Sequence, residues 1–258
     1  MNLFDFSVVY EDFWAILEYL PITLKLTAVA AVFGLALGFL LAVLRMKQIP
    51  VVRQLINFYI SLIRGTPTIV QLYVTYFGIP IFLKYVNYKY ATNIEINMIP
   101  AIFFAYLALA VNQSAFNAVT IQSALEAVDK GEIEAATAIG MTAPQRMLRI
   151  ILPEAAELAI PSLGNTFINL IKGTSLAFSC AVIEMTAAGK LMAARDYRYF
   201  EAYVALAIIY WLLTILTEFV INGVINLVKI PETPAQGHVK KKTIPFFALP
   251  SWRKEKTA

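Results

Sequence analysis

Five long apolar stretches constrain this chain more than any other feature. They cover residues 20–44, 55–83, 98–120, 155–182 and 203–228. A helix needs about 20 mostly apolar residues to cross a bilayer. Only 15% of the residues are charged, whereas a soluble domain carries about 25%. The sequence therefore predicts an all-α integral membrane protein in which each stretch is one transmembrane helix.

The second stretch contains a predicted break. It is about 29 residues long, which is more than a straight crossing requires. The residues "RGTP" lie in its first half, and Pro67 lacks the backbone N–H that a continuous helix needs. We therefore expect this span to be tilted or broken.

The two ends of the chain differ from the apolar middle, residues 20–230. Residues 1–19 are too short and too acidic to span, and we expect an interfacial segment on the extracellular side, without a removable signal peptide. Residues 231–258 are basic and rich in proline, which predicts a disordered cytoplasmic tail. The only histidine, His238, lies in that tail, and we expect it to be solvated.

Basic residues indicate how the spans are oriented. Lysine and arginine in short loops favour the cytoplasmic side. With the N-terminus outside, 13 basic residues fall on the inner side and 5 on the outer side, and Lys25, Arg64 and Lys172 lie inside spans. This asymmetry predicts an extracellular N-terminus and a cytoplasmic C-terminus. The loop at about residues 125–153 is then cytoplasmic.

This loop has the pattern of two short helices. Residues 132–139 are good helix formers, and Gly140 suits the left-handed conformation that ends a helix. Thr142 can cap a second helix over residues 143–152, and Pro153 is expected to break the chain before the fourth span. The second helix carries apolar side chains among its arginines. An exposed apolar patch of this kind indicates a protein partner.

Here the chain resembles the permease subunits of ATP-binding-cassette importers. Their cytoplasmic signature matches, with every spacing met, at Glu134, Ala135, Ala136, Gly140, Ile150, Leu152 and Pro153. The resemblance implies a five-helix type I importer permease whose cytoplasmic loop is the coupling helix, which docks on an ATPase subunit. It extends over about residues 15–230.

More of the sequence is similar to the polar-amino-acid branch of that family. The similar segments are "YISLIRGTPTIVQL" in the second span and "IPSLGNTFINLIKGTSLAF" in the fourth. One departure is plain, because Val119 and Gln122 occupy the positions where the branch carries glutamate and arginine. A division of labour with a non-identical partner permease is one explanation. The segments "KGTSLAF" and "YRYFEAYVALAIIYW" resemble cystine-type importers.

Polar residues inside the spans are the candidates for the substrate path. Such groups are costly in a bilayer and usually face the protein interior. In the fourth span, Ser162, Asn165, Asn169 and Lys172 share one helical face, and Thr166 lies beside them. The remaining candidates are Asn112, Gln113 and Asn117 in the third span, in a row with Thr120, and Thr66 and Gln71 near the break.

Two interpretations of these polar residues stay open. They can supply donors and acceptors to an amino-acid zwitterion, or they can hold helices together. Lys172 requires a partner, and Glu184 and Asp196 are possible protein partners in the outer loop.

The sequence also bears on the class of function. It has no Gly-x-x-x-x-Gly-Lys phosphate loop, no hydrolytic set and no metal-ligand spacing. We therefore expect no catalytic or metal site, no enzyme activity, no cofactor bound by this chain and no nucleic-acid partner.

The resemblance implies the partners. They are a second, identical or non-identical permease, two ATP-binding subunits that use ATP and Mg²⁺, an extracellular solute-binding protein and an amino-acid substrate, in the cytoplasmic membrane. The alternatives are an ion-coupled secondary transporter, a permease of the same family for another small solute, and a membrane enzyme or scaffold.

Overall fold

The computed structural model describes residues 4–47 and 49–229, and the regular structure in this part of the chain is helical throughout. The predicted tail at residues 231–258, with His238, lies outside the described residues. In chain order the elements are α1 (Phe6–Leu17), α2 (Leu20–Met46), α3 (Pro50–Gly65), α4 (Thr68–Tyr90), η1 (Ile96–Met98), α5 (Ala101–Glu126), α6 (Lys130–Ala138), α7 (Ala143–Arg146), η2 (Met147–Ile151), α8 (Leu152–Gly173), η3 (Thr174–Cys180), α9 (Met185–Asp196) and α10 (Tyr199–Val228).

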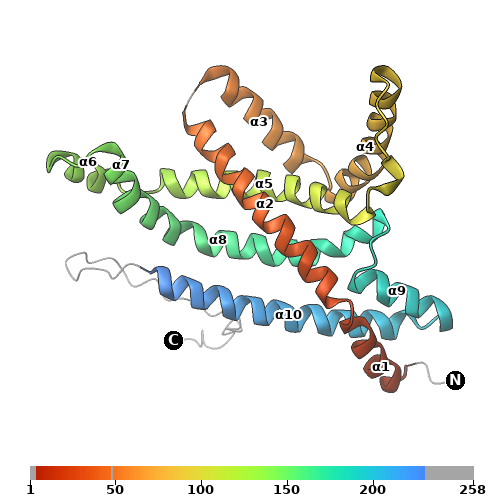
Figure 1. The fold of residues 1–258 in the computed structure, drawn as a ribbon. Helices are drawn as coiled ribbons and strands as arrows, with labels where there is room; N and C mark the ends of the chain where they lie inside the picture. Colours follow the sequence, from red (N-terminus) through yellow and green to blue (C-terminus); the bar gives the residue numbers. More distant parts are fainter. Residues whose placement is uncertain (1–3, 48, 230–258) are drawn as a thin grey trace, which may run out of the picture.

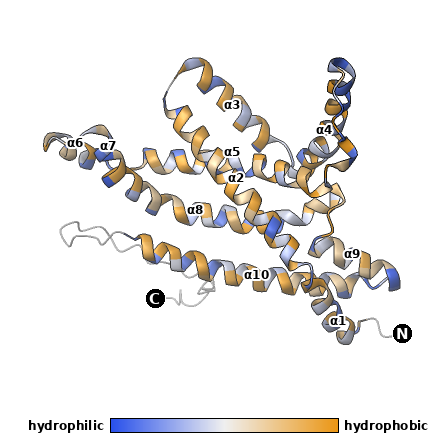
Figure 2. Ribbon diagram, viewed as in Figure 1, coloured by the Kyte–Doolittle hydropathy of each residue, from blue (hydrophilic) through white to orange (hydrophobic). Residues whose placement is uncertain are grey.

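The described helices include enough long apolar segments for five crossings. The helices α2, α4, α5 and α10 are each long and apolar enough to cross a membrane. A further crossing comes from Ala143–Cys180 together with Met185–Asp196, a pair bent by 55°. Figure 2 shows hydrophobic residues along most of the length of α2 and α10. The all-helical fold class is therefore confirmed.

The break expected in the span over residues 55–83 is confirmed, but the bounds expected for that span were wrong, because the crossing helix is Thr68–Tyr90. The chain forms two separate helices, because Thr66 is extended at ψ 141° and Pro67 caps the start of α4. α3 has 16 residues and α4 has 23, so α4 alone has the length of a crossing. The break lies where the missing N–H of Pro67 predicted it. Figure 1 shows that the far end of α4 stands apart from the other helices.

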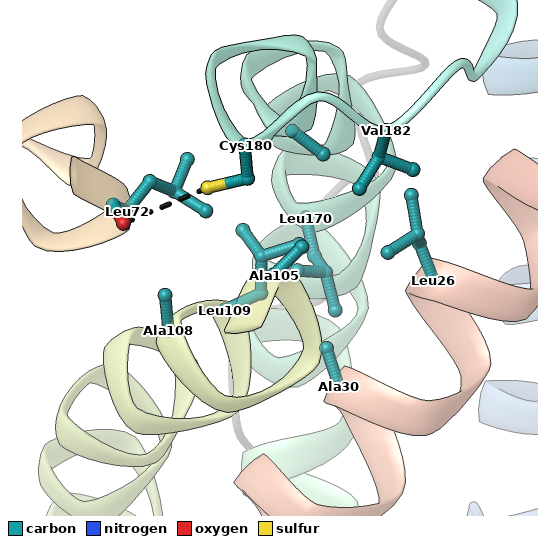
Figure 3. Packing of buried hydrophobic residues seen from close by; sticks show 10 residues of the cluster. Leu26, Ala30, Leu72, Ala105, Ala108, Leu109, Leu170, Cys180 and Val182 are labelled. Carbon is teal, nitrogen blue, oxygen red and sulfur yellow. Dashed lines mark hydrogen bonds between the residues drawn. The ribbon is translucent and has the colours of Figure 1, made fainter. Parts of the chain in front are cut away.

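The core lies where α2, α4, α5, α8 and η3 meet. Leu26, Leu72, Leu109 and Cys180 are almost fully buried there, and Figure 3 shows their side chains converging. The thiol of Cys180 donates to the carbonyl oxygen of Leu72 over 3.5 Å. This contact ties the end of η3 to the first turns of α4.

The two ends of the helical bundle carry different elements. Figure 1 shows α6, α7 and the last turn of α10 at one end, and α1 and α9 at the other. At the second end, Arg198 lies 3.7 Å from Asp5 and 3.6 Å from Glu201, and the rings of Phe4 and Phe200 make an edge contact. These contacts hold the N-terminal segment against α10.

Candidate functional site

The loop between α5 and α8 closes on itself through its caps. Asp129 accepts from the N–H of Gly131 over 2.7 Å at the start of α6. At the other end, the N–H of Met141 donates to the carbonyl of Ala136, and Gly140 has φ +83°. This is the hydrogen-bond pattern of a left-handed helix end. The predicted left-handed conformation of Gly140 is confirmed.

The second part of the loop begins with a side-chain cap. The side chain of Gln145 accepts from the N–H of Thr142 over 2.8 Å, which is one half of a capping box. Arg146 donates from Nη1 to the carbonyl of Met141 over 2.7 Å. The chain reversal between α6 and α7 is therefore fixed by hydrogen bonds on both of its sides.

The prediction that Pro153 breaks the chain was wrong. Met147–Ile151 forms a π-helical turn in which the N–H of Leu152 reaches the carbonyl of Met147, and α8 begins directly at Leu152. Pro153 lies in the first turn of α8. A wider π-turn relieves the clash between a proline ring and the carbonyl four residues earlier. The short helix expected over residues 143–152 is consequently part of one helix that runs into the membrane.

The signature residues divide into an exposed and a partly buried group. Glu134, Ala135 and Gly140 are exposed, whereas Ala136 is buried. The remaining three are partly buried at the base of the loop: Ile150, Leu152 and Pro153.

Next to this base lies an apolar cluster. It joins the end of α5 to the start of α8 through Ala124, Val128, Ala155 and Ala159. The loop is therefore attached to two membrane helices through one packed base.

The outer surface of the loop carries large apolar side chains. Ile139 is 79% exposed, Leu148 66% and Met147 41%. Exposed apolar groups at the tip of a helical loop mark a surface for another protein. The loop thus combines exposed apolar side chains with hydrogen-bonded caps.

Three of the predicted path residues form one hydrogen-bonded group at the break between α3 and α4. Gln71 donates from Nε2 to the carbonyl of Ile63 over 2.7 Å and to the hydroxyl of Thr66 over 2.8 Å. Its Oε1 accepts from Asn112 of α5 over 3.0 Å. Gln71 therefore satisfies the carbonyl of Ile63, which the missing N–H of Pro67 leaves without its helical partner.

Gln113 and Asn117 lie in a helix contact. Both are buried in α5, and they face Gly34 and Gly38 of α2. A Cβ atom on Gly34 would lie 2.7 Å from Cβ of Gln113, and one on Gly38 would lie 2.7 Å from Cβ of Asn117. Small residues permit this close approach of two membrane helices. Thr120, further along α5, is partly buried.

The polar stripe of α8 points away from the core of its own chain. Its four members are exposed: Ser162, Asn165, Asn169 and Lys172. The opposite face of α8 is buried through Gly164, Ile168 and Ile171. Thr166 is partly buried and donates to the carbonyl of Ser162 over 2.8 Å. The stripe therefore presents amides and an ammonium to whatever covers this side of the chain.

Neither protein partner considered for Lys172 contacts it. Glu184 is fully buried, accepts from the N–H groups of Thr186 and Ala187 over 2.9 Å each, and caps α9. Asp196 accepts from the N–H of Arg198 over 3.1 Å. Within the described residues the only ion pairs are those of Arg198 with Asp5 and Glu201.

One polar group at the loop end of the bundle was not anticipated. Arg45, in the last turn of α2, donates from Nε to Asn57 of α3 over 2.7 Å and from Nη1 to Gln122 of α5 over 2.8 Å. Gln122 in turn donates to Glu126 over 2.7 Å. The sequence offered one signal for it, because Gln122 is a departure from the related branch.

Comparison with known proteins identifies the family. Residues 34–228 match the family described as "Binding-protein-dependent transport system inner membrane component". The chain belongs to that family. The match covers the helices from within α2 to the end of α10, including the loop with its signature residues.

Individual relatives and a solved structure agree with this assignment. The probable amino-acid permease protein YxeN of Bacillus subtilis is 41% identical over 84% of this chain and 92% of its own length. The L-cystine transport system permease protein TcyL of Bacillus subtilis is 35% identical over 84% and 88%. A solved structure described as an amino acid ABC transporter with histidines is 31% identical, covers 87% of this chain and 99% of that chain, and has a TM-score of 0.73. The chain is therefore an importer permease of the ATP-binding-cassette class.

Proposed function

We propose that this chain carries a polar L-amino acid inward across the cytoplasmic membrane, as one permease subunit of an ATP-driven importer. The named functions of the relatives support the substrate class, since YxeN and TcyL are described as amino-acid and L-cystine permeases. Cystine is the first candidate to test.

The observation that carries this proposal is the exposed polar stripe of α8. Amide and ammonium groups cannot face hydrocarbon at low cost, so they line protein or water. Because the stripe residues are exposed, no described part of the chain covers that side of α8. A second permease placed against it, identical or homologous, encloses a polar path between the two subunits. The carboxylate and ammonium of an amino acid find donors and acceptors in such a path.

The loop end of the bundle fits an energy-supplying partner. Its exposed apolar tip, Ile139, Met147 and Leu148, is the surface we assign to the ATPase. Two ATP-binding subunits, one under each permease, bind and hydrolyse ATP with Mg²⁺, and this chain takes no part in that chemistry. An extracellular solute-binding protein delivers the substrate at the other end, and the excess of inner basic residues supports an outside N-terminus.

Transport then follows alternating access. Closure of the ATPases displaces the two loops, the permeases rock against each other, and the path opens on one side at a time. The apolar base of the loop transmits the displacement to α5 and α8.

Lys172 provides the test of the path. In a reconstituted complex at saturating binding protein, Lys172→Met should lower substrate-stimulated ATP hydrolysis about tenfold, because a hydrogen bond to a charged group is lost. Lys172→Arg should retain part of it. The chain should still fold, because Lys172 is exposed within it, and co-purification of the ATPase measures whether the complex assembles.

Lys25→Met is the matched control, since Lys25 is also exposed within a span but lies outside the stripe. Unchanged stimulation in Lys172→Met removes this residue from the path. Loss of assembly assigns it a structural role instead.

A further inference from the structure

Arg45 connects three helices at the end of the bundle that carries the loop between α5 and α8, called the coupling loop from here on. Its guanidinium bonds Asn57 of α3 over 2.7 Å and Gln122 of α5 over 2.8 Å, from the last turn of α2. The side chain is half-buried, whereas the nearby Lys47 and Arg53 are exposed. A guanidinium that is partly removed from water needs such partners.

The amide of Gln122 lies between opposite charges. Its oxygen accepts from Arg45, and its nitrogen donates to Glu126 over 2.7 Å, one helical turn further along α5. A reversed amide would place its N–H groups against the guanidinium and its oxygen against the carboxylate. The two charges therefore fix the orientation of the amide, and the row from Arg45 through Gln122 to Glu126 is electrostatically matched.

The row from Arg45 to Glu126 lies next to the loop that we propose docks on the ATPase. Glu126 is the last residue of α5, and α6, which begins at Lys130, carries the first signature residues. A second tie lies further up the same helices, where the hydroxyl of Tyr59 contacts Ser114 over 2.7 Å and donates to the carbonyl of Val111 over 3.1 Å. The end of α5 is thus attached to α2 through Arg45, and its middle is attached to α3 through Tyr59.

We infer that Arg45 is a positioning residue for coupling. Through its bonds to Asn57 and Gln122, it makes α2, α3 and the end of α5 move as one body when the loop is displaced. This inference rests on the proposed function. Val119, one turn before Gln122 in α5, packs against the apolar cluster of Ile56, Ile60 and Ala118.

The test moves the guanidinium from one helix to the other. In the complete reconstituted complex, Arg45→Gln should lower the stimulation of ATP hydrolysis by substrate-loaded binding protein about fivefold, a value within the range for one coupled pair. Gln122→Arg should lower it similarly, because two guanidinium groups then meet. The double variant Arg45→Gln/Gln122→Arg should recover at least half of the wild-type stimulation, and Arg45→Lys should retain part.

Arg53→Gln is the matched control, because it removes an exposed arginine from α3. Assembly is measured in parallel by co-purification of the ATPase. Recovery of stimulation in the double variant supports the inference, whereas recovery of assembly without stimulation gives Arg45 a structural role and overturns it. A double variant no better than the two single variants overturns it, as does wild-type stimulation in Arg45→Gln. A wild-type complex that responds to no amino acid would contradict the proposed function instead.

Discussion

Gly140 has a backbone conformation that its neighbours in the loop do not share. Its φ of +83° is costly for a residue with a side chain, by about 1–2 kcal/mol. A Cβ atom there would meet no other atom of the chain within 4 Å. Gly140→Val should therefore strain the loop without disturbing the bundle. We expect reduced ATPase association and reduced coupled uptake with normal membrane insertion, measured by co-purification and by uptake assays.

Gly223→Val is the control for this change. Gly223 lies in α10, has open space around its Cα and has no positive φ. Transport by Gly140→Val at the level of this control would show that the loop does not dock as proposed.

Single residues were predictable where backbone chemistry decides the outcome. The spacing around Gly140 indicated a left-handed helix end because few residues other than glycine adopt it. The neighbours of polar residues were not predictable. Gln113 and Asn117 share a helical face with the same periodicity as the stripe of α8. Gln113 and Asn117 are nevertheless buried against α2, whereas the stripe of α8 is exposed. Only the packing of whole helices distinguishes the two.

At the scale of elements, α2 and α5 form a closely packed helix pair that a substitution can test. Cβ on Gly38 would lie 2.7 Å from Cβ of Asn117 and 3.0 Å from the carbonyl of Ser114. Gly38→Val must push the helices apart, which should lower stability by about 1–3 kcal/mol. The unfolding temperature of the purified complex in detergent measures this change.

The same Gly223→Val variant serves as the reference, because its new side chain meets open space. Equal unfolding temperatures for the two variants would mean that α2 and α5 do not pack as closely as described.

The existence of the helices was predictable, and their junctions were less so. Apolar length indicates a span, and Pro67 indicated a break, because both follow from backbone hydrogen bonding. The outcome at Pro153 was not predictable, since a π-turn accommodates the proline there, whereas at Pro67 the chain is extended. Which of the two occurs depends on the surrounding packing.

For the whole molecule, the orientation in the membrane can be measured directly. In a Cys180→Ala background, a cysteine at position 89 should react with an impermeant thiol reagent on intact cells, and a cysteine at position 130 should not. Lys89 and Lys130 are both exposed, so accessibility within the chain does not bias the result. The 13-to-5 excess of inner basic residues is the physical reason.

Labelling at position 130 without labelling at position 89 would show that the chain has the opposite orientation in the membrane. It would place the loop outside and separate it from any cytoplasmic ATPase. The predicted orientation rests on loop charge alone, whereas the proposed path also requires a second subunit, whose contacts cannot be read from one chain.

The uninterrupted helix from Ala143 to Cys180 has a mechanical consequence. At 1.5 Å per residue it is about 55 Å long, which exceeds the hydrocarbon core of a bilayer by about 25 Å. One end lies in the coupling loop and the other beside the core residue Leu72. A tilt of about 10° around the midpoint of such a lever moves each end by about 5 Å. If the loop docks on the ATPase as proposed, a modest rotation there displaces the other end of this helix by a distance about as wide as a small solute.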